Sequence, residues 1–124
     1  MIAYLAGEPG DAVVADLLTD PESVCYAHSV NLCEVYYDTL RATDEERARA
    51  VISTLFSDGV IERKNMSRAF WQRVGALKSR GGISLADCFG IALAQELDGE
   101  IVTSDHHEFD RLVPIGIVSI RFIR

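Results

Sequence analysis

Residues 83–105 have the sequence ISLADCFGIALAQELDGEIVTSD, and this stretch decides the class of fold. The mostly apolar segment Ile83–Leu97 has the length of a helix, and it predicts a helix that is buried on more than one side. Asp98 and Gly99 predict a turn, after which Ile101–Thr103 predicts a short strand. A buried helix that leads through a tight turn into an apolar strand is typical of α/β proteins.

Upstream of this stretch, helix-start signals recur between short apolar runs. Asp11 is predicted to cap a helix that begins with AVVADLL. Thr43 and Glu46 form a capping box ahead of a helix that continues to Phe56. Ser67 is predicted to cap a further helix, which runs toward Lys78 and ends at Gly81 and Gly82.

Short strands are predicted at residues 24–27, 59–63 and 115–123. The helix predicted at residues 29–42 is expected to bury a single stripe of its surface. The residues of that stripe are Val30, Cys33, Tyr37 and Leu40. Helices that alternate with short strands predict an α/β fold with a mostly parallel central sheet.

The length of 124 residues, without repeats or linkers, predicts a single domain over residues 1–124. The chain opens in a helix-like segment, whereas an α/β domain usually starts with a strand. An apolar fraction of 48% and a charged fraction of 25% are those of an ordinary globular protein. No apolar run approaches the roughly 20 residues that span a bilayer. The start MIAYLAGEPGD lacks the features of a secretory signal, so we expect a cytoplasmic protein with no membrane partner.

Cys25, Cys33 and Cys88 are odd in number and show no CxxC spacing. A zinc site that combines them with histidines has no local motif behind it. Buried, reduced thiols are the simpler interpretation, and they also favour the cytoplasm.

The net charge of -7 is unevenly distributed. Residues 41–80 hold nine Lys and Arg against five Asp and Glu, whereas the remainder holds three against fourteen. An acidic site beside a basic middle segment suits a metal enzyme that acts on a phosphate polymer. Solvated helix faces explain the same charges without any site.

Three carboxylates from separate segments are predicted to meet at one edge of the sheet. Ligands of parallel sheets collect at the carboxyl ends of the strands, and Asp105 lies just after the strand 101–103. Asp87 lies in the first turn of the buried helix, which runs antiparallel to that strand. Glu34 lies early in the helix that follows the strand 24–27. Each has a simpler interpretation: Asp87 as part of a capping box with Ser84, Asp105 as a cap, and Glu34 as an exposed acid.

Clustered carboxylates repel one another unless a cation neutralises them, and Mg²⁺ or Mn²⁺ suits an all-oxygen site. Such an ion activates water and stabilises charge on a phosphodiester.

Three segments together resemble the PIN domain, and within that family the VapC-like toxins of bacterial toxin–antitoxin pairs. They are IAYLAGEPG, HSVNLCEVYYD and SLADCFGIALAQELDGEIVTSDHHEFDRL. The resemblance covers essentially the whole chain, and its pattern includes apolar spacing as well as acids.

The resemblance implies a three-layer α/β/α fold and Mg²⁺- or Mn²⁺-dependent endoribonuclease activity. It assigns the catalytic and metal-binding acids to Glu34, Asp87 and Asp105, with Glu108 as a further metal ligand. It also implies a homodimer and a cognate antitoxin that covers the acidic groove.

The resemblance further implies a strand that ends in an aspartate ahead of IAYLAGEPG. Because Met1 falls after that point, we expect this strand and its aspartate to be absent from the sequence. Either the start lies upstream, or this is a shortened and impaired version. An alternative function is therefore a catalytically impaired PIN domain that acts as a partner-binding module. A phosphatase is disfavoured, since the chain has no Gly-rich phosphate loop.

In TSDHHEF, Thr103 and Ser104 are expected to support Asp105, and Phe109 is expected to anchor the turn in the core. His106 and His107 are interpreted as surface residues. In the basic middle segment, Phe70, Trp71 and Arg73 are candidates for RNA contact, although core or dimer packing is the favoured interpretation.

Overall fold

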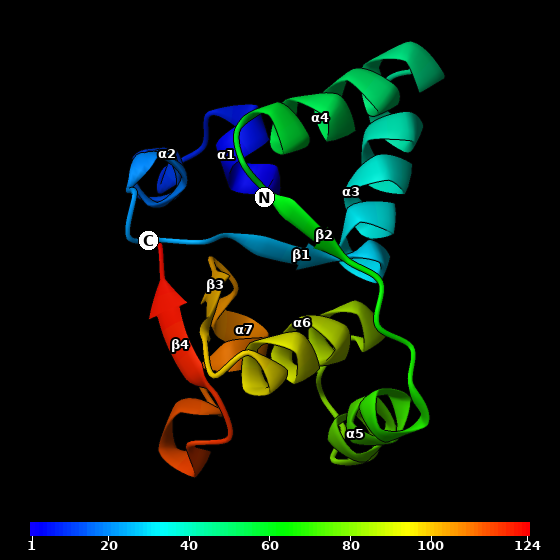
Figure 1. Cartoon of the computed structure of the whole chain (residues 1–124), viewed down its shortest axis with the longest axis vertical. Coiled ribbons are helices and arrows are strands. Elements are labelled where there is room, and N and C mark those ends of the chain that lie inside the picture. Colours follow the sequence, from blue (N-terminus) through cyan, green and yellow to red (C-terminus); the bar gives the residue numbers. More distant parts are fainter. The chain divides into compact units, whose positions relative to one another are not determined.

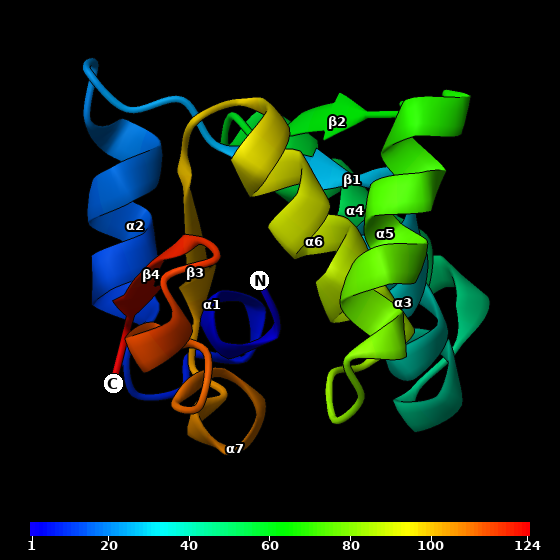
Figure 2. The same cartoon turned by 90° about the horizontal axis from the view of Figure 1, so that it is seen from below.

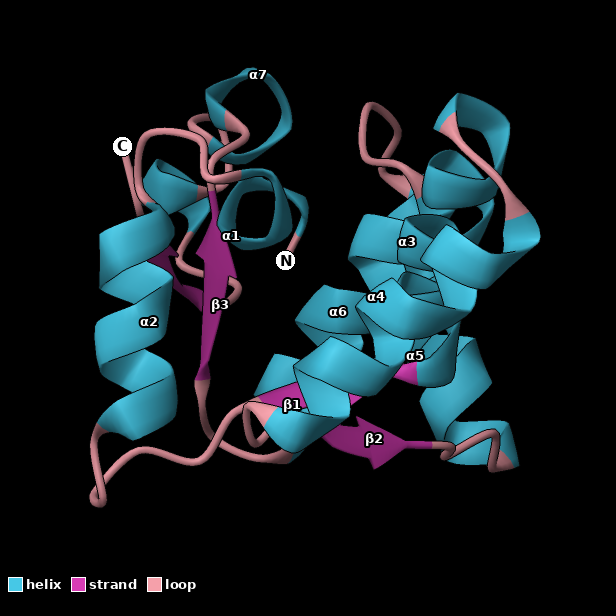
Figure 3. Ribbon diagram, turned by 90° about the horizontal axis from the view of Figure 1, so that it is seen from above, coloured by secondary structure: helices cyan, strands magenta, loops and turns pink.

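The computed structural model describes residues 1–124, which form two compact units, Met1–Lys64 and Asn65–Arg124. Each unit contains both helices and strands (Figure 3). In each unit the strands form one parallel pair. The predicted α/β class with parallel strands is therefore confirmed. Hydrogen bonding divides the strands into two two-stranded sheets, and the assignment of residues 1–124 to one domain stays a prediction.

The first unit is mainly helical, with one strand pair (Figure 1). Its strands are joined in parallel register, with Tyr26 opposite Ile61 and His28 opposite Arg63. Its elements are α1 (Ile2–Ala6), α2 (Asp11–Thr19), β1 (Tyr26–His28), α3 (Ser29–Ala42), α4 (Glu45–Ser57) and β2 (Ile61–Arg63).

The core of the first unit lies between α3, α4 and the strand pair. Its buried residues are Ala27, Leu32, Val35, Val51, Leu55 and Val60. The stripe predicted for α3 was wrong, since Leu32 and Val35 are buried and Tyr37 is 42% exposed. The helix carries apolar residues on two faces, and the packing partners, rather than periodicity, decide which face is covered.

Three local predictions in this unit need correction. The N-cap of α4 is Asp44, whose side chain accepts a hydrogen bond from the Arg47 N–H at 2.8 Å, and not Thr43. Asp11 is the first residue of α2, and Gly10 precedes it as the N-cap. Strand β1 begins two residues later than predicted and includes His28, which is buried. The imidazole Nδ1 of His28 accepts from the Val30 N–H and so caps α3.

The second unit holds the stretch that defined the fold class. Its helices α5 and α6 pack side by side (Figure 2). Between them Phe70 meets Phe89, with ring centroids 6.0 Å apart. Its elements are α5 (Arg68–Ser79), α6 (Leu85–Glu96), β3 (Glu100–Thr103), α7 (His106–Phe109), the 3-10 helix η1 (Val113–Ile115) and β4 (Ser119–Phe122).

Helix α6 is buried on more than one side, as its sequence predicted. Six of its twelve residues are buried, on several sides of the helix: Cys88, Phe89, Ile91, Ala92, Leu93 and Ala94. Apolar burial of this extent stabilises the unit by about 25 cal/mol for each Å² removed from water. The predicted caps are confirmed, because Ser67 and Ser84 accept hydrogen bonds from the N–H groups of Phe70 and Asp87.

Strands β3 and β4 run parallel, with Thr103 opposite Phe122, so their carboxyl ends lie at the same edge. The main-chain N–H of Ile123 donates to the Thr103 carbonyl at 3.0 Å and extends the pairing past β4. Residues Ser104 and Asp105 leave β3 at this edge and lead into α7. Asp105, the first acid of the candidate site, therefore lies at this edge.

Candidate metal centre

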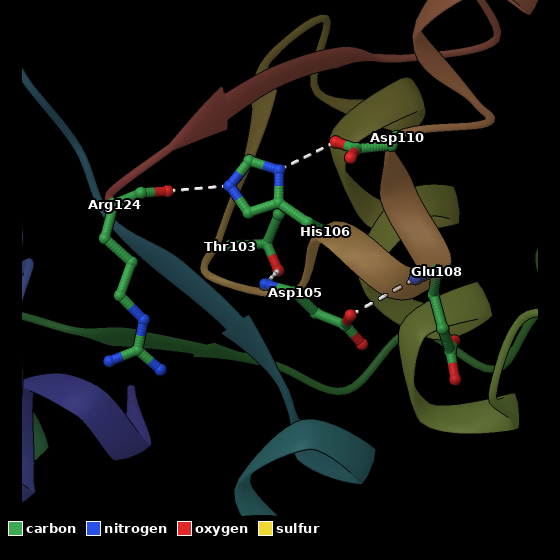
Figure 4. Close-up of polar contacts among 6 residues, drawn as sticks. All are labelled: Thr103, Asp105, His106, Glu108, Asp110 and Arg124. Atoms are coloured by element: carbon green, nitrogen blue, oxygen red, sulfur yellow. Dashed lines mark hydrogen bonds and ion pairs between the residues drawn. The ribbon is translucent and has the colours of Figure 1, made fainter.

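Asp105 is held at the end of β3 by two local hydrogen bonds (Figure 4). Its main-chain N–H donates to the Thr103 hydroxyl at 3.0 Å. Its carboxylate caps α7 by accepting from the Glu108 N–H at 3.2 Å. The predicted support from Thr103 is thus present. The alternative interpretation of Asp105 as a helix cap is also correct, and one carboxylate oxygen is enough for that cap.

Asp87 lies in the first turn of α6, where Ser84 contacts it twice. The Ser84 hydroxyl accepts from the Asp87 N–H at 3.0 Å and donates to the Asp87 carboxylate at 2.8 Å. In a capping box the acid would accept the main-chain N–H of the capping serine. Here that N–H donates to Glu108 at 2.6 Å instead. Ser84 and Asp87 therefore form only half of a capping box, because Glu108 accepts the hydrogen bond from the Ser84 N–H in place of Asp87.

Glu108 connects α7 to the start of α6. Its main-chain N–H is bound by Asp105, and its carboxylate is bound by the Ser84 N–H. A carboxylate at the N-terminus of a helix is favoured by the helix dipole. This contribution offsets part of the repulsion that arises where several carboxylates gather.

The carboxylates of Asp87, Asp105 and Glu108 form one cluster. Each offers one oxygen, and these three oxygens all lie within 4.8 Å of one another. All three residues are half-buried. None of the ion pairs in the chain involves Asp105 or Glu108.

This donor set fits a hard divalent cation. Oxygens bound to one Mg²⁺ at about 2.1 Å lie at most about 4.2 Å apart, so small side-chain rotations would bring the three oxygens around one ion. Mg²⁺ usually retains several waters, which suits three carboxylate ligands. The residues present therefore fit Mg²⁺ or Mn²⁺, and Asp87, Asp105 and Glu108 would hold it.

Glu34 lies on α3 in the first unit, where it is half-buried. The cluster that the structure brings together lies entirely in the second unit and contains three of the four predicted acids. The role of Glu34 as a fourth acid stays a prediction.

The two histidines of TSDHHEF take no part in the carboxylate cluster. The His106 ring is hydrogen-bonded at 2.7 Å to the Asp110 carboxylate and at 2.7 Å to the Arg124 carbonyl (Figure 4). It also stacks on Phe122 with centroids 4.2 Å apart. The Arg124 carbonyl and then the Asp110 carboxylate raise the pKa of His106. His106 thus ties α7 to the end of β4, while His107 is exposed and Phe109 is fully buried as predicted.

The structure argues against the zinc alternative. The one group of histidine, cysteine or acidic side chains close enough to hold a metal consists of carboxylates alone, and none of the three cysteines belongs to it. Burial raises the pKa of the Cys25 and Cys88 thiols, which disfavours the thiolate that binds zinc. The expectation that all thiols are buried was wrong for Cys33, which is exposed.

In the basic segment, the two aromatic residues of α5 have different environments. Phe70 is 1% exposed and belongs to the core, as favoured from the sequence. Trp71 is 47% exposed, so core packing does not account for it. Arg73 is exposed as well.

An α/β fold with a carboxylate cluster at the carboxyl end of a strand defines a class of proteins suited to hold a divalent cation. The chain matches the PIN domain model over residues 1–113 and belongs to this family, whose members are generally metal-dependent nucleases. A search of curated proteins finds no match to the chain. No helix of the structure is both long and apolar enough to cross a bilayer.

Sequence reasoning missed two features of the site. The first is the contact between Ser84 and Glu108, which links residues 24 positions apart. The second is the approach of Arg111 to Gly82, which depends on how the α5–α6 loop meets α7. The sequence showed Gly81 and Gly82 only as a helix end.

Proposed function

We propose that this chain is a Mg²⁺- or Mn²⁺-dependent endoribonuclease of the VapC-like kind, which hydrolyses phosphodiester bonds of RNA. The observation that carries the proposal is the convergence of Asp87, Asp105 and Glu108, with ligand oxygens within 4.8 Å, in a chain of the PIN family. Glu34 is proposed as the further catalytic acid. A bound divalent ion would activate water and neutralise charge on the phosphodiester.

The remaining residues of the site hold the carboxylates in place. Ser84 fixes Asp87 through its hydroxyl and Glu108 through its N–H. Thr103 and the start of α7 fix Asp105. Because these hydrogen bonds hold the carboxylates close together, only small side-chain rotations are needed when a cation binds.

We further propose a homodimer and a cognate antitoxin as partners, as the VapC-like resemblance implies. The exposed apolar stripe of α3 supports an interface on that helix. Its residues Cys33, Tyr37 and Leu40 are all exposed, although they are spaced as a packing face.

The proposal is tested by incubating the purified chain with single-stranded RNA in Mn²⁺ and in EDTA. We expect cleavage in Mn²⁺ only, and its loss in Asp105→Asn and Glu34→Gln. Asparagine is as good a helix cap as aspartate, so Asp105→Asn removes the charge and keeps the start of α7. Asp98→Asn is the matched control, because Asp98 lies in the turn that follows α6, at φ 51°, a conformation that asparagine also tolerates.

Cleavage that persists in EDTA, or equal cleavage by Asp105→Asn and the unaltered chain, would contradict the proposal. Absence of cleavage at millimolar Mn²⁺, together with binding of a protein partner, would favour the partner-binding module instead.

A further inference from the structure

The loop between α5 and α6 makes a close contact with Arg111. Gly82 has φ +69°, and a Cβ built on it would overlap the Nη1, Nη2 and Cζ atoms of Arg111. The guanidinium therefore lies directly on the Gly82 main chain. A Cβ at this position would push the guanidinium, the far end of a flexible side chain, away from the loop, and the positive φ independently favours glycine.

One nitrogen of this guanidinium is anchored and two are available. Nε of Arg111 donates to the main-chain carbonyl of Glu108 at 3.2 Å. The terminal nitrogens take part in none of the ion pairs or hydrogen bonds of the chain. Arg111 as a whole is exposed, although its guanidinium lies against Gly82.

Arg111 is thereby held close to Glu108 and the loop before Ser84, yet it forms no ion pair with Asp105 or Glu108. Its anchor is the main chain of Glu108, and Gly82 lies two residues before Ser84, whose N–H binds the Glu108 carboxylate. An arginine so near several acids would usually form a bidentate pair with one of them. Here those acids are bound to Ser84 and to the start of α7.

A guanidinium with two unpaired, parallel N–H donors matches the geometry of a phosphate group. The neighbouring cluster suits a divalent cation, and a phosphodiester is an anion that interacts with a cation and a guanidinium at the same time. We propose that Arg111 binds a phosphate of the RNA substrate at the mouth of the carboxylate cluster, and that Gly82 leaves the room for it. This inference rests on the proposed function, since it assigns a residue to the substrate of that site.

The test measures binding of a fluorescein-labelled single-stranded RNA by anisotropy in EDTA, where cleavage does not interfere. For Arg111→Ala, we expect the Kd to rise about fivefold to tenfold, as befits the loss of a charge-assisted phosphate contact. Between about 50 and 200 mM salt, the slope of log Kd against log salt should fall by about 0.7, the value for one phosphate of a single strand. Arg111→Lys keeps the charge and loses the fork, so its Kd should lie between the two.

The two loop glycines provide a matched pair of variants. Gly82→Ala should weaken RNA binding in the direction of Arg111→Ala, because the new Cβ displaces the guanidinium although its charge remains. Gly81→Ala imposes similar backbone strain, at φ +79°, but its Cβ meets nothing within 4 Å. Its RNA affinity should equal that of the unaltered chain.

Three outcomes would overturn the proposal. The first is an unchanged salt slope in Arg111→Ala, and the second is equal RNA affinity of Gly81→Ala and Gly82→Ala. The third is loss of Mn²⁺ binding in Arg111→Ala, which would show that Arg111 positions the metal-binding carboxylates instead of binding the RNA. If the unaltered chain cleaves no RNA in Mn²⁺ but its RNA binding depends on Arg111, the proposed nuclease fails while the phosphate site stands. If the unaltered chain binds no RNA, both fail.

Discussion

Ser84 is the residue through which Asp87 and Glu108 are held together, because its hydroxyl binds one carboxylate and its N–H binds the other. Ser84→Ala should lower the free energy of unfolding by about 1 kcal/mol through loss of the cap, and should also weaken Mn²⁺ binding. Ser67→Ala is the matched control, since Ser67 caps α5 in the same manner. Chemical denaturation should show similar losses for both variants, and calorimetry should show weaker Mn²⁺ binding for Ser84→Ala alone. Equal Mn²⁺ affinities would contradict the role of Ser84 in the cluster.

His106 gives the chain a pH-dependent contact at its C-terminal end. The carbonyl of Arg124 and the carboxylate of Asp110 raise its pKa in the folded state. A raised folded pKa means that the contact contributes fully below the unfolded pKa of about 6.5 and is lost as the pH rises through the folded pKa.

The free energy of unfolding should therefore fall between pH 6 and pH 8 by more in the unaltered chain than in His106→Gln. Urea denaturation of both proteins at the two pH values measures this difference. A difference that is absent or of opposite sign would show that these partners do not raise the pKa of His106 in the folded chain.

At the scale of single elements, α5 separates a core aromatic residue from a surface one. Phe70→Ala should lower the free energy of unfolding by about 3–5 kcal/mol, because it leaves a cavity against Phe89. Trp71→Ala should cost less than about half as much, since Trp71 is 47% exposed. Urea denaturation of the two variants tests this order, and equal losses would mean that Trp71 packs against a partner, such as a second copy.

The elements also show which features of the fold follow from sequence alone. Helix α6 and strand β3 were predicted to within two residues, because a serine cap, a long apolar run and a turn at Asp98 and Gly99 are local signals. The buried face of α3 was not predicted correctly. Both of its faces carry apolar residues, and the choice of Leu32 and Val35 is made by packing against other elements.

For the candidate site, position along the elements was more informative than residue type. Asp87 and Asp105 were predicted to approach each other because a helix start and a strand end meet at one edge of a parallel sheet, and the structure brings them together. Contacts of Ser84 and Arg111 with α7 and the glycine loop could not be predicted. In each contact, a side chain meets the main chain of a residue 24 or more positions away.

At the scale of the whole molecule, the charge distribution agrees with a cation-dependent acidic centre. The chain carries a net charge of -7, and the carboxylate cluster adds local repulsion that a divalent ion would relieve. A ligand that binds only the folded chain stabilises it by about 2.7 kcal/mol at 100 times its Kd. Saturating Mn²⁺ should therefore raise the midpoint of thermal unfolding, and EDTA should reverse the rise. Asp105→Asn should show no rise, and a rise equal to that of the unaltered chain would place the ion elsewhere.

The most direct test of the central claim is calorimetric titration of the chain with Mn²⁺, with Asp105→Asn and Glu108→Gln as test variants and Asp98→Asn as the control. If the cluster is a metal centre, the unaltered chain and the control bind Mn²⁺ with a Kd in the micromolar to sub-millimolar range, whereas both test variants lose this binding. A folded, unaltered chain that binds no Mn²⁺ at millimolar concentration would contradict the claim that Asp87, Asp105 and Glu108 form a metal centre.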